Sequence, residues 1–239
     1  MINHKLKKIT TAIIVAILSS SCQANIFRKA EQAKTKAIAE EKSQPNIVYG
    51  DLIFKEQSDD LMIPVNIKNY YPINRKISLD SSAYSEKEIE LYNIIFSNKK
   101  NGESHLLINK KAIISSFDFL EKKEAGKPST RFWLYRIIEN DTNKDNKLNS
   151  QDAIIGYISD SSGRNLQQVT PNNTQLISWT IVQSVGAIFL KIIEDSDNDK
   201  KFTEQDKINF IKVNLNKLAI GAEIISDQID QEIKSYIFK

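Results

Sequence analysis

From Pro45 onward the apolar residues come in short runs, separated by clusters of Asn, Asp, Ser and Gly. The runs are rich in β-branched and aromatic residues, which favour strands. The Asn-Gly pair at the centre of residues 98–103 predicts a tight hairpin turn. Since no run in this part of the chain is long and helically periodic, we predict a mostly β fold, an antiparallel meander. The predicted strands are 46–54, 61–67, 91–97, 104–108, 112–120, 131–139, 153–159, 166–170, 175–182, 187–194, 208–215 and 232–238.

The stretch before Pro45 has a different pattern, rich in Ala, Lys, Glu and Gln. Its apolar positions fall near one helical face, but most of them are Ala. We therefore predict a short helical tether over residues 22–46, followed by a β domain over 47–239. A helix lying on a membrane surface is the alternative, although the apolar face is thin for that role.

The first 21 residues have the pattern of an export signal. Lys5, Lys7 and Lys8 precede a short apolar segment, residues 9–18, and small residues follow it. The apolar segment is too short to span a membrane as a helix. We predict that residues 1–21 are a signal peptide that is removed.

Cys22 is the only cysteine in the chain, so no internal disulfide can form. Its place directly after Leu18-Ser19-Ser20-Ser21 resembles the lipobox of bacterial lipoproteins, although Leu lies one position further from the cysteine than is commonest. The resemblance implies that Cys22 is acylated and anchors the protein in a membrane. Gln23, in place of Asp, implies by the same resemblance the outer membrane. An ordinary secretory signal with a free thiol left over is the alternative.

The formal net charge of +3 comes from the predicted signal peptide. Removing its three lysines from 33 basic residues leaves 30, against 30 acidic residues. A balanced chain lacks the net basic surface that nucleic-acid binding requires. We therefore expect no nucleic-acid partner.

The chain contains an internal repeat. The segment "YRIIEN" leads into one Asp-rich loop, residues 141–152, and "LKIIE" leads into a second, residues 195–206, which starts 54 residues later (195 minus 141). This period suits a four-stranded unit with a loop insertion. The segment 159–179 between them resembles the blade junction of TolB-like β-propeller repeats, which implies propeller-like blades. The chain has room for about three, fewer than the four of the smallest closed propellers, so an incomplete propeller or a sandwich is expected.

Both Asp-rich loops place oxygen-bearing residues at alternate positions. Calcium takes six to eight oxygen ligands, and a loop can supply most of them from positions 1, 3, 5, 7, 9 and 12. We predict two calcium loops with position 7 contributing its backbone carbonyl. The first has Asp141, Asn143, Asp145, Lys147, Asn149 and Asp152 at these positions; the second has Asp195, Asp197, Asp199, Lys201, Thr203 and Asp206.

The loops resemble the EF-hand loop, and more closely the variant that ends in Asp, as in dockerin-like repeats. Leu148 and Phe202 at position 8 are expected to pin the loops to the core. Position 6 departs from the usual Gly, since it is Asn146 in one loop and Lys200 in the other. The flanks read as strands rather than helices. The alternative is that Asp and Asn simply stabilise hairpin turns.

We expect weak calcium sites of the extracellular kind, with a Kd of roughly 10⁻⁵ to 10⁻³ M, because lysines flank both loops. No nucleophile–histidine set can be assembled, since His105 is the only histidine outside the predicted signal. We therefore expect no enzyme but a calcium-binding envelope lipoprotein with a structural or protein-binding role, and an envelope protein as its partner. A metal-independent interaction module is the alternative, and a hydrolase with a calcium-stabilised fold is a weaker one.

Overall fold

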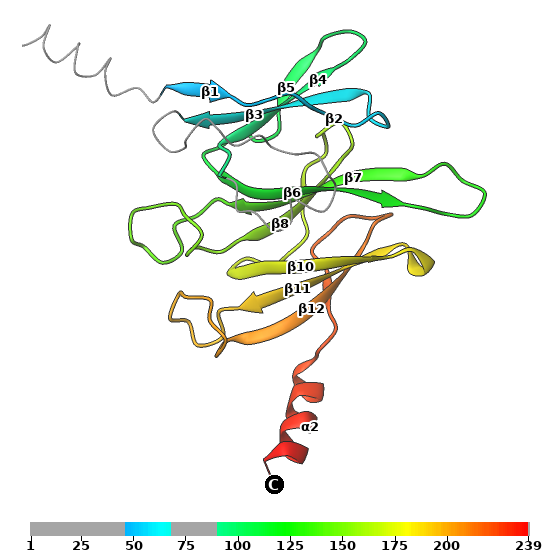
Figure 1. Ribbon diagram of the computed structural model, residues 1–239. Helices are drawn as coiled ribbons and strands as arrows, with labels where there is room; N and C mark the ends of the chain where they lie inside the picture. The colour runs from blue at the N-terminus through cyan, green and yellow to red at the C-terminus, as the bar shows by residue number, and fades with distance from the viewer. Residues whose placement is uncertain (1–45, 68–89, 239) are drawn as a thin grey trace, which may run out of the picture. The chain divides into compact units, whose positions relative to one another are not determined.

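The β-branched and aromatic runs form strands in three antiparallel sheets, which confirms the prediction of a mostly β fold (Figure 1). The computed structural model describes residues 46–67 and 90–238. The first sheet contains β1 (Ile47–Tyr49), β2 (Ile53–Phe54), β3 (Asp60–Ile67), β4 (Asn93–Asn98) and β5 (Ser104–Leu106). The middle sheet contains β6 (Ile113–Lys122), β7 (Thr130–Ile138), β8 (Ile155–Asp160) and β9 (Gln167–Gln168). The third sheet contains β10 (Thr174–Val182), β11 (Ala187–Glu194), β12 (Lys207–Asn214) and β13 (Ala222–Glu223), with a short 3₁₀ turn, η1 (Gln183–Val185), before β11.

The chain divides after Asn46, and all the strands belong to the unit Ile47–Lys239. The predicted signal peptide (1–21), Cys22 and nearly all of the predicted tether (22–46) lie outside the described residues. In the part of the chain that the structure describes, no helix has the length and apolar character needed to cross a membrane.

The middle sheet is buried on both faces, as the unbroken apolar run of β7 requires. Alternate residues of a strand point to opposite faces of its sheet. Trp133 and Tyr135 pack into a core shared with the first sheet, whereas Phe132 and Leu134 pack into a core shared with the third sheet. The middle sheet is therefore packed between the other two.

Tight turns join the strands where the sequence supplies left-handed residues. The hairpin predicted at 98–103 is present between β4 and β5, with Gly102 at a φ of 75° and Asn98 N donating to Glu103 O at 2.9 Å. After β8, Gly163 has a φ of 78° and lies against the ring of Phe96 from the first sheet. A Cβ at Gly163 would lie 2.3 Å from that ring, so only glycine fits this turn.

The first and third sheets share a polar clamp on the strand that precedes the last strand of each sheet. The Asn93 side chain at β4 accepts from Ile108 N (3.1 Å) and donates to Ile108 O (2.7 Å). The Asn209 side chain at β12 makes the same pair of bonds with Ile225, at 3.1 and 3.2 Å. In each case the clamp fixes the chain just after the last strand of the sheet. The same side-chain device at the same position indicates that these sheets are copies of one structural unit.

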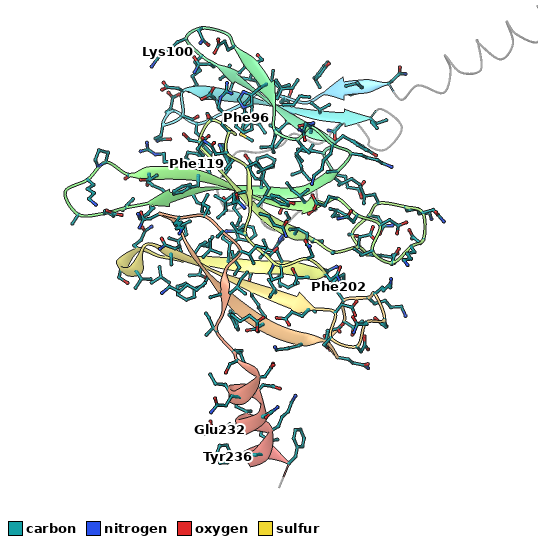
Figure 2. The ribbon with its side chains drawn as sticks, turned by 180° about the vertical axis from the view of Figure 1, so that it is seen from behind. Phe96, Lys100, Phe119, Phe202, Glu232 and Tyr236 are labelled. Carbon is teal, nitrogen blue, oxygen red and sulfur yellow. The ribbon has the colours of Figure 1, made fainter. Side chains whose placement is uncertain are left out.

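The strand predicted at 232–238 is wrong, because this segment belongs to the helix α2 (Asp227–Ile237). Ser226 caps the helix by accepting from Ile229 N at 3.3 Å. Asp230 pairs with Lys234 at 2.6 Å, one turn later. The predicted strand covers only the last part of the helical segment, where Tyr236 and Ile237 also fit a strand pattern, and it leaves out the capping residue Ser226. Figure 2 shows α2 with Glu232 and Tyr236 labelled.

Candidate metal-binding loops

The two Asp-rich loops occupy the same place in neighbouring sheets. Residues 141–152 connect β7 with β8, and residues 195–206 connect β11 with β12. Each loop therefore joins the second strand of its sheet to the third strand. The internal repeat seen in the sequence is present as a structural equivalence.

The closing aspartate of each loop ties the loop together from inside. Asp152 is fully buried, and its carboxylate accepts from Thr142 N at 2.8 Å and from Asn149 N at 3.0 Å. The loop therefore has an internal frame that does not depend on a metal. Asp152 Oδ1 accepts from Thr142 N, Thr142 Oγ1 and Asn143 N, whereas Oδ2 accepts from Asn149 N and keeps a second lone pair for a cation.

Asp206 has the same role in the second loop. It is 7% exposed, and its carboxylate accepts from Ser196 N at 3.0 Å and from Thr203 N at 2.8 Å. The backbone bonds from Thr203 and Ser196 hold the pKa of Asp206 below its ordinary value. The fold therefore favours a charged carboxylate at the end of the second loop.

In the first loop, the side chains at positions 1, 3 and 5 turn the backbone. Asp141 accepts from Asp145 N at 3.1 Å and from Asn146 N at 2.8 Å. Asn143 accepts from Asp145 N at 3.0 Å, and Asp145 accepts from Lys147 N at 2.8 Å. Asn149 accepts from Gln151 N at 2.8 Å. The predicted side-chain ligands of this loop all accept backbone amides within the loop.

The second loop brings three carboxylates together. One oxygen from each of Asp195, Asp197 and Asp199 lies within 4.8 Å of the others. Asp195 Oδ2 accepts from Lys200 N at 3.2 Å, whereas Asp195 Oδ1 is shielded from solvent and has no hydrogen-bond partner. An unpaired carboxylate oxygen at low solvent exposure costs free energy that a bound cation would recover.

The remaining predicted ligands of the second loop lie beside this cluster. Thr203 and Asp206 bond to each other through Thr203 Oγ1 and Asp206 Oδ2 at 3.3 Å, and Asp206 is not part of the three-carboxylate cluster. Lys201, expected to contribute its carbonyl, has its ammonium group 3.6 Å from Asp199 Oδ2. This ammonium group is exposed, so it screens the cluster only partly.

Both loops use left-handed residues at positions 4 and 6. Lys144 and Asn146 have φ values of 63° and 64°, and the equivalent Asn198 and Lys200 have φ values of 61° and 66°. The sequence identified position 6 as the site of this conformation but gave no indication for position 4. Lysine is strained in the left-handed region by roughly 1 to 2 kcal/mol. The loop frame therefore holds one strained lysine in each copy.

The apolar residue at position 8 behaves as predicted in the second loop. Phe202 is half-buried and packs against the core between the first and middle sheets (Figure 2). Leu148 in the first loop is also half-buried. Phe202 therefore anchors the second loop to the fold.

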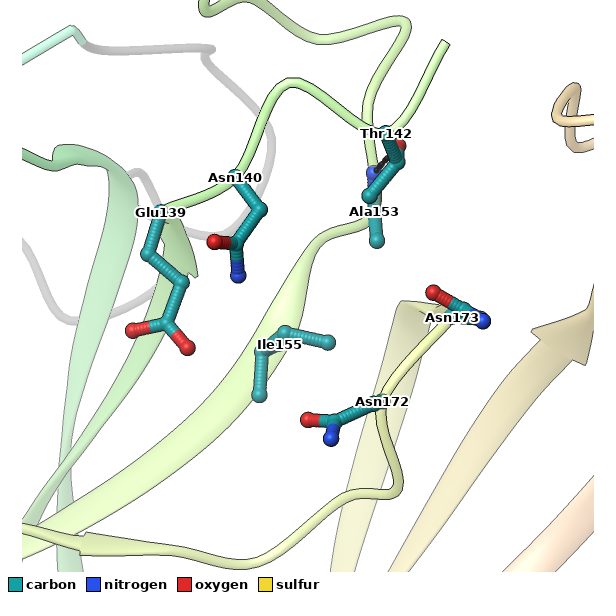
Figure 3. Close-up of a pocket in the computed structure, with 7 residues that line it drawn as sticks. All are labelled: Glu139, Asn140, Thr142, Ala153, Ile155, Asn172 and Asn173. Atoms are coloured by element: carbon teal, nitrogen blue, oxygen red, sulfur yellow. Dashed lines mark hydrogen bonds between the residues drawn. The ribbon is translucent and has the colours of Figure 1, made fainter.

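A shallow polar pocket lies beside the first loop. It has a volume of about 170 Å³ and is lined by Glu139, Asn140, Thr142, Ala153, Ile155, Asn172 and Asn173 (Figure 3). Glu139 pairs with Lys110 and accepts from Tyr157 Oη at 2.9 Å. Thr142 Oγ1 accepts from Ala153 N at 3.0 Å and so links the pocket wall to the loop. The sequence gave no signal for this pocket, because its residues come from three separate segments.

The sequence also missed a half-buried polar cluster between the middle and third sheets. Asp118 accepts from Trp179 Nε1 at 3.2 Å, and the Arg136 guanidinium lies 4.8 Å from the centre of the Trp179 ring. Burial raises the pKa of Asp118 and lowers that of Arg136. A hydrolytic pair would need a second carboxyl converging on Asp118.

Of the other aromatic and histidine positions, Trp133 is buried in the core, as its strand pattern predicts. His105 lies on β5, and its ring stacks on that of Phe96 with 5.7 Å between the ring centres. Its role in the described part of the fold is packing.

Comparison of the chain with models of protein families, with curated proteins and with solved structures found no match.

Proposed function

We propose that this chain is a calcium-binding lipoprotein of a bacterial envelope, anchored to the outer membrane through Cys22. The two loops each take one calcium ion weakly, and the three sheets are the blades of an incomplete propeller. Calcium stiffens the loop ends of the middle and third sheets, in a structural or protein-binding role.

The observation that carries the calcium proposal is the carboxylate cluster of the second loop. Asp195, Asp197 and Asp199 lie within reach of one ion, and Asp195 Oδ1 has no other partner. Calcium prefers carboxylate and carbonyl oxygens in a flexible cage, which a loop of this type supplies. The equivalent first loop has Asn143 in place of Asp197, so it offers one carboxylate fewer. The second loop is therefore the stronger site.

The expected stabilisation follows from binding to the folded state alone. At a calcium concentration tenfold above Kd, each site adds RT ln 11, which is about 1.4 kcal/mol. Two such sites raise the melting temperature of a chain of this size by roughly 6 to 11 °C. Calorimetric titration after treatment with chelator measures the sites directly, and thermal melting measures their effect.

The two loops supply matched variants for each other. Asp197→Asn gives the second loop the residue that the first loop has at position 3, and the Asn side chain can still accept from Asp199 N, as Asp197 does at 3.0 Å. We expect the second site to weaken about tenfold, since affinity follows ligand charge. Asn143→Asp should strengthen the first site. Asp59→Asn, at a residue whose exposed side chain pairs with Lys100, is the control and should change neither site.

Absence of heat and of a melting shift at millimolar calcium would reduce the loops to hairpin turns. The chain would then fit the second candidate function, a metal-independent envelope interaction module. That alternative is favoured by the exposed apolar residues of the first sheet, which include Tyr49, Phe54 and Leu106.

The membrane anchor has a separate test. Cys22→Ser should move the chain from the membrane fraction to the soluble fraction and abolish incorporation of a labelled fatty acid. Stable anchoring follows from acyl chains because each buried methylene contributes about 0.8 kcal/mol. A variant that stays in the membrane without label would refute lipid anchoring and leave the calcium proposal untouched.

A further inference from the structure

Each sheet uses its two faces differently, and a pair of facing residues on two neighbouring strands marks each face; these strands are β3 and β4, β7 and β8, and β11 and β12. We call the face toward the preceding sheet the leading face and the other the trailing face. Tyr135 pairs with Tyr157 on the leading face of the middle sheet, and both pack against the first sheet. Leu190 pairs with Ile211 on the leading face of the third sheet, and both pack against the middle sheet.

The trailing faces are marked by the pairs one step along the same strands. Met62 pairs with Phe96 on the first sheet and lies in the core with the leading face of the middle sheet. Leu134 pairs with Ile158 on the middle sheet and lies in the core with the leading face of the third sheet. The molecule therefore forms the same trailing-to-leading junction twice.

One face of each type remains without a partner sheet among the described residues. The leading face of the first sheet carries the pair Ile63 and Ile95, and the trailing face of the third sheet carries Phe189 and Lys212. Besides those on α2 and elsewhere on the surface, seven exposed apolar residues lie on these two faces. They are Ile47, Tyr49, Phe54 and Leu106 on the first sheet and Ile208, Phe210 and Ile224 at the third.

A cation–aromatic contact accompanies both junctions. Lys55, next to β2 of the first sheet, lies 6.0 Å from the ring centre of Phe119 on the first strand of the middle sheet. Arg136 of the middle sheet lies 4.8 Å from the ring centre of Trp179 on the first strand of the third sheet. The unpartnered faces also carry a cation and an aromatic ring. Lys191 lies opposite Phe210 on the third sheet, and Tyr49 lies on the first strand of the first sheet.

We infer that the trailing face of the third sheet binds the leading face of the first sheet of a second copy of this chain. Two copies then contribute three sheets each to a closed ring of six, within the range of about four to eight blades that propellers use. Repeat proteins end in polar capping surfaces, and this chain has apolar ones instead. The inference rests on the proposed blade arrangement and is independent of calcium.

Two copies form a stable assembly only if the ring closes, because closure doubles the buried area. A face of three strands, each about eight residues long, covers roughly 27 Å by 14 Å, or about 400 Å². One junction buries about 800 Å², which is the size of a crystal contact, whereas the two junctions of a closed ring bury about 1,600 Å², the size of a stable interface. A head-to-tail contact that fails to close would instead continue as a filament.

Disulfide cross-linking tests whether two copies form the ring. The full chain is used, and it is expressed in a bacterial host in which any export and acylation can take place. Lys212 of one copy and Ile63 of the other are equivalent to Phe96 and Tyr135, which share a core within one molecule. Mild oxidation of the Ile63→Cys/Lys212→Cys variant should give a covalent dimer and nothing larger, while each single variant should stay monomeric on a denaturing gel. A ladder of larger species would overturn the closed ring, and a monomer in the double variant would overturn the assembly.

Charge substitution gives a second, independent measurement. Leu106 and Phe210 are 56% and 39% exposed, so Leu106→Lys and Phe210→Lys should leave the internal cores intact. Each residue occurs twice in the ring, and a loss of about 30-fold at each place raises the dimer Kd about a thousandfold. Val185→Lys in the η1 turn, at a residue 54% exposed and on no strand of either sheet, is the control and should not change Kd. Sedimentation in detergent, with and without chelator, measures the dimer; a chain that is monomeric at every concentration would refute the inference even if calcium binds.

Discussion

Replacing Gly163 with alanine tests the packing of the first sheet on the middle sheet. Gly163 has a φ of 78°, and its missing Cβ would lie 2.3 Å from two ring carbons of Phe96. Phe96 is fully buried between the two sheets, so its ring has little room to move. The substitution therefore introduces both a strained backbone and a steric clash.

The backbone strain and the steric clash can be separated by comparison with glycines that have the same conformation but no neighbouring atoms. The left-handed conformation costs alanine about 1 to 2 kcal/mol, and overpacking a core adds about 1 to 3 kcal/mol. Gly102 and Gly126 both have a φ of 75°, and nothing lies within 4 Å of a Cβ at either position. Alanine at these two positions should cost only the backbone term. We expect Gly163→Ala to destabilise the fold by about 2 to 5 kcal/mol.

Urea denaturation of the three alanine variants measures the difference. Phe96→Leu in the Gly163→Ala chain should recover part of the loss, because contacting residues couple by about 0.5 to 3 kcal/mol. Equal destabilisation at Gly163, Gly102 and Gly126, with no coupling to Phe96, would refute the contact between the turn and the first sheet.

Three further outcomes are expected. Burial raises the pKa of Tyr135 above its ordinary value, so the stability that it contributes is complete below a pH of about 10 and is lost above it; the part of the tyrosinate absorbance that Tyr135→Phe removes should therefore appear only as the protein unfolds. The lowered pKa of Asp206 gives the opposite sign, since its contribution is present above a pH of about 4 and is lost on further acidification; urea midpoints should fall with pH less steeply in Asp206→Asn than in the parent. Ser226→Ala removes the cap of α2 and should weaken that helix by about 1 kcal/mol, seen as faster hydrogen exchange at the Ile229 amide while exchange in the sheets is unchanged.

The sheet content could be predicted because strand signals are local. The run around Trp133 alternates between two apolar faces, and both faces are buried in the fold. The turn at Asn98 follows from its own residues. Which sheet packs on which face could not be predicted, because that depends on contacts such as Phe96 with Gly163, between residues far apart in the sequence.

The C-terminal helix was missed for a local reason. The apolar residues Ile229, Ile233 and Tyr236 follow a helical spacing, but the last of them also fit a short strand. The deciding residue, Ser226, lies before the predicted strand 232–238, and it supplies the capping bond. A wider reading would have found the cap followed by acidic residues in the first turn.

The candidate loops were located from spacing alone, and their internal geometry was only partly foreseen. The spacing identified the oxygens that gather in the second loop, at Asp195, Asp197 and Asp199. It did not show that Asp152 and Asp206 bind backbone amides within their own loops. That role depends on the path of the loop backbone, which the residue types do not determine.

Each sheet is made from one continuous stretch of the chain, and this has a consequence for the order of folding. Most strand pairing between neighbours in sequence closes short loops and so forms quickly, although residues 68–92 separate β3 from β4. The first sheet can form while the segments for the others are still being synthesised, and each later sheet then finds a finished surface to pack on. Phe96 lies on that surface and contacts the turn at Gly163 once the middle sheet has formed. A stalled chain would therefore first become resistant to proteolysis when the middle sheet packs on the first.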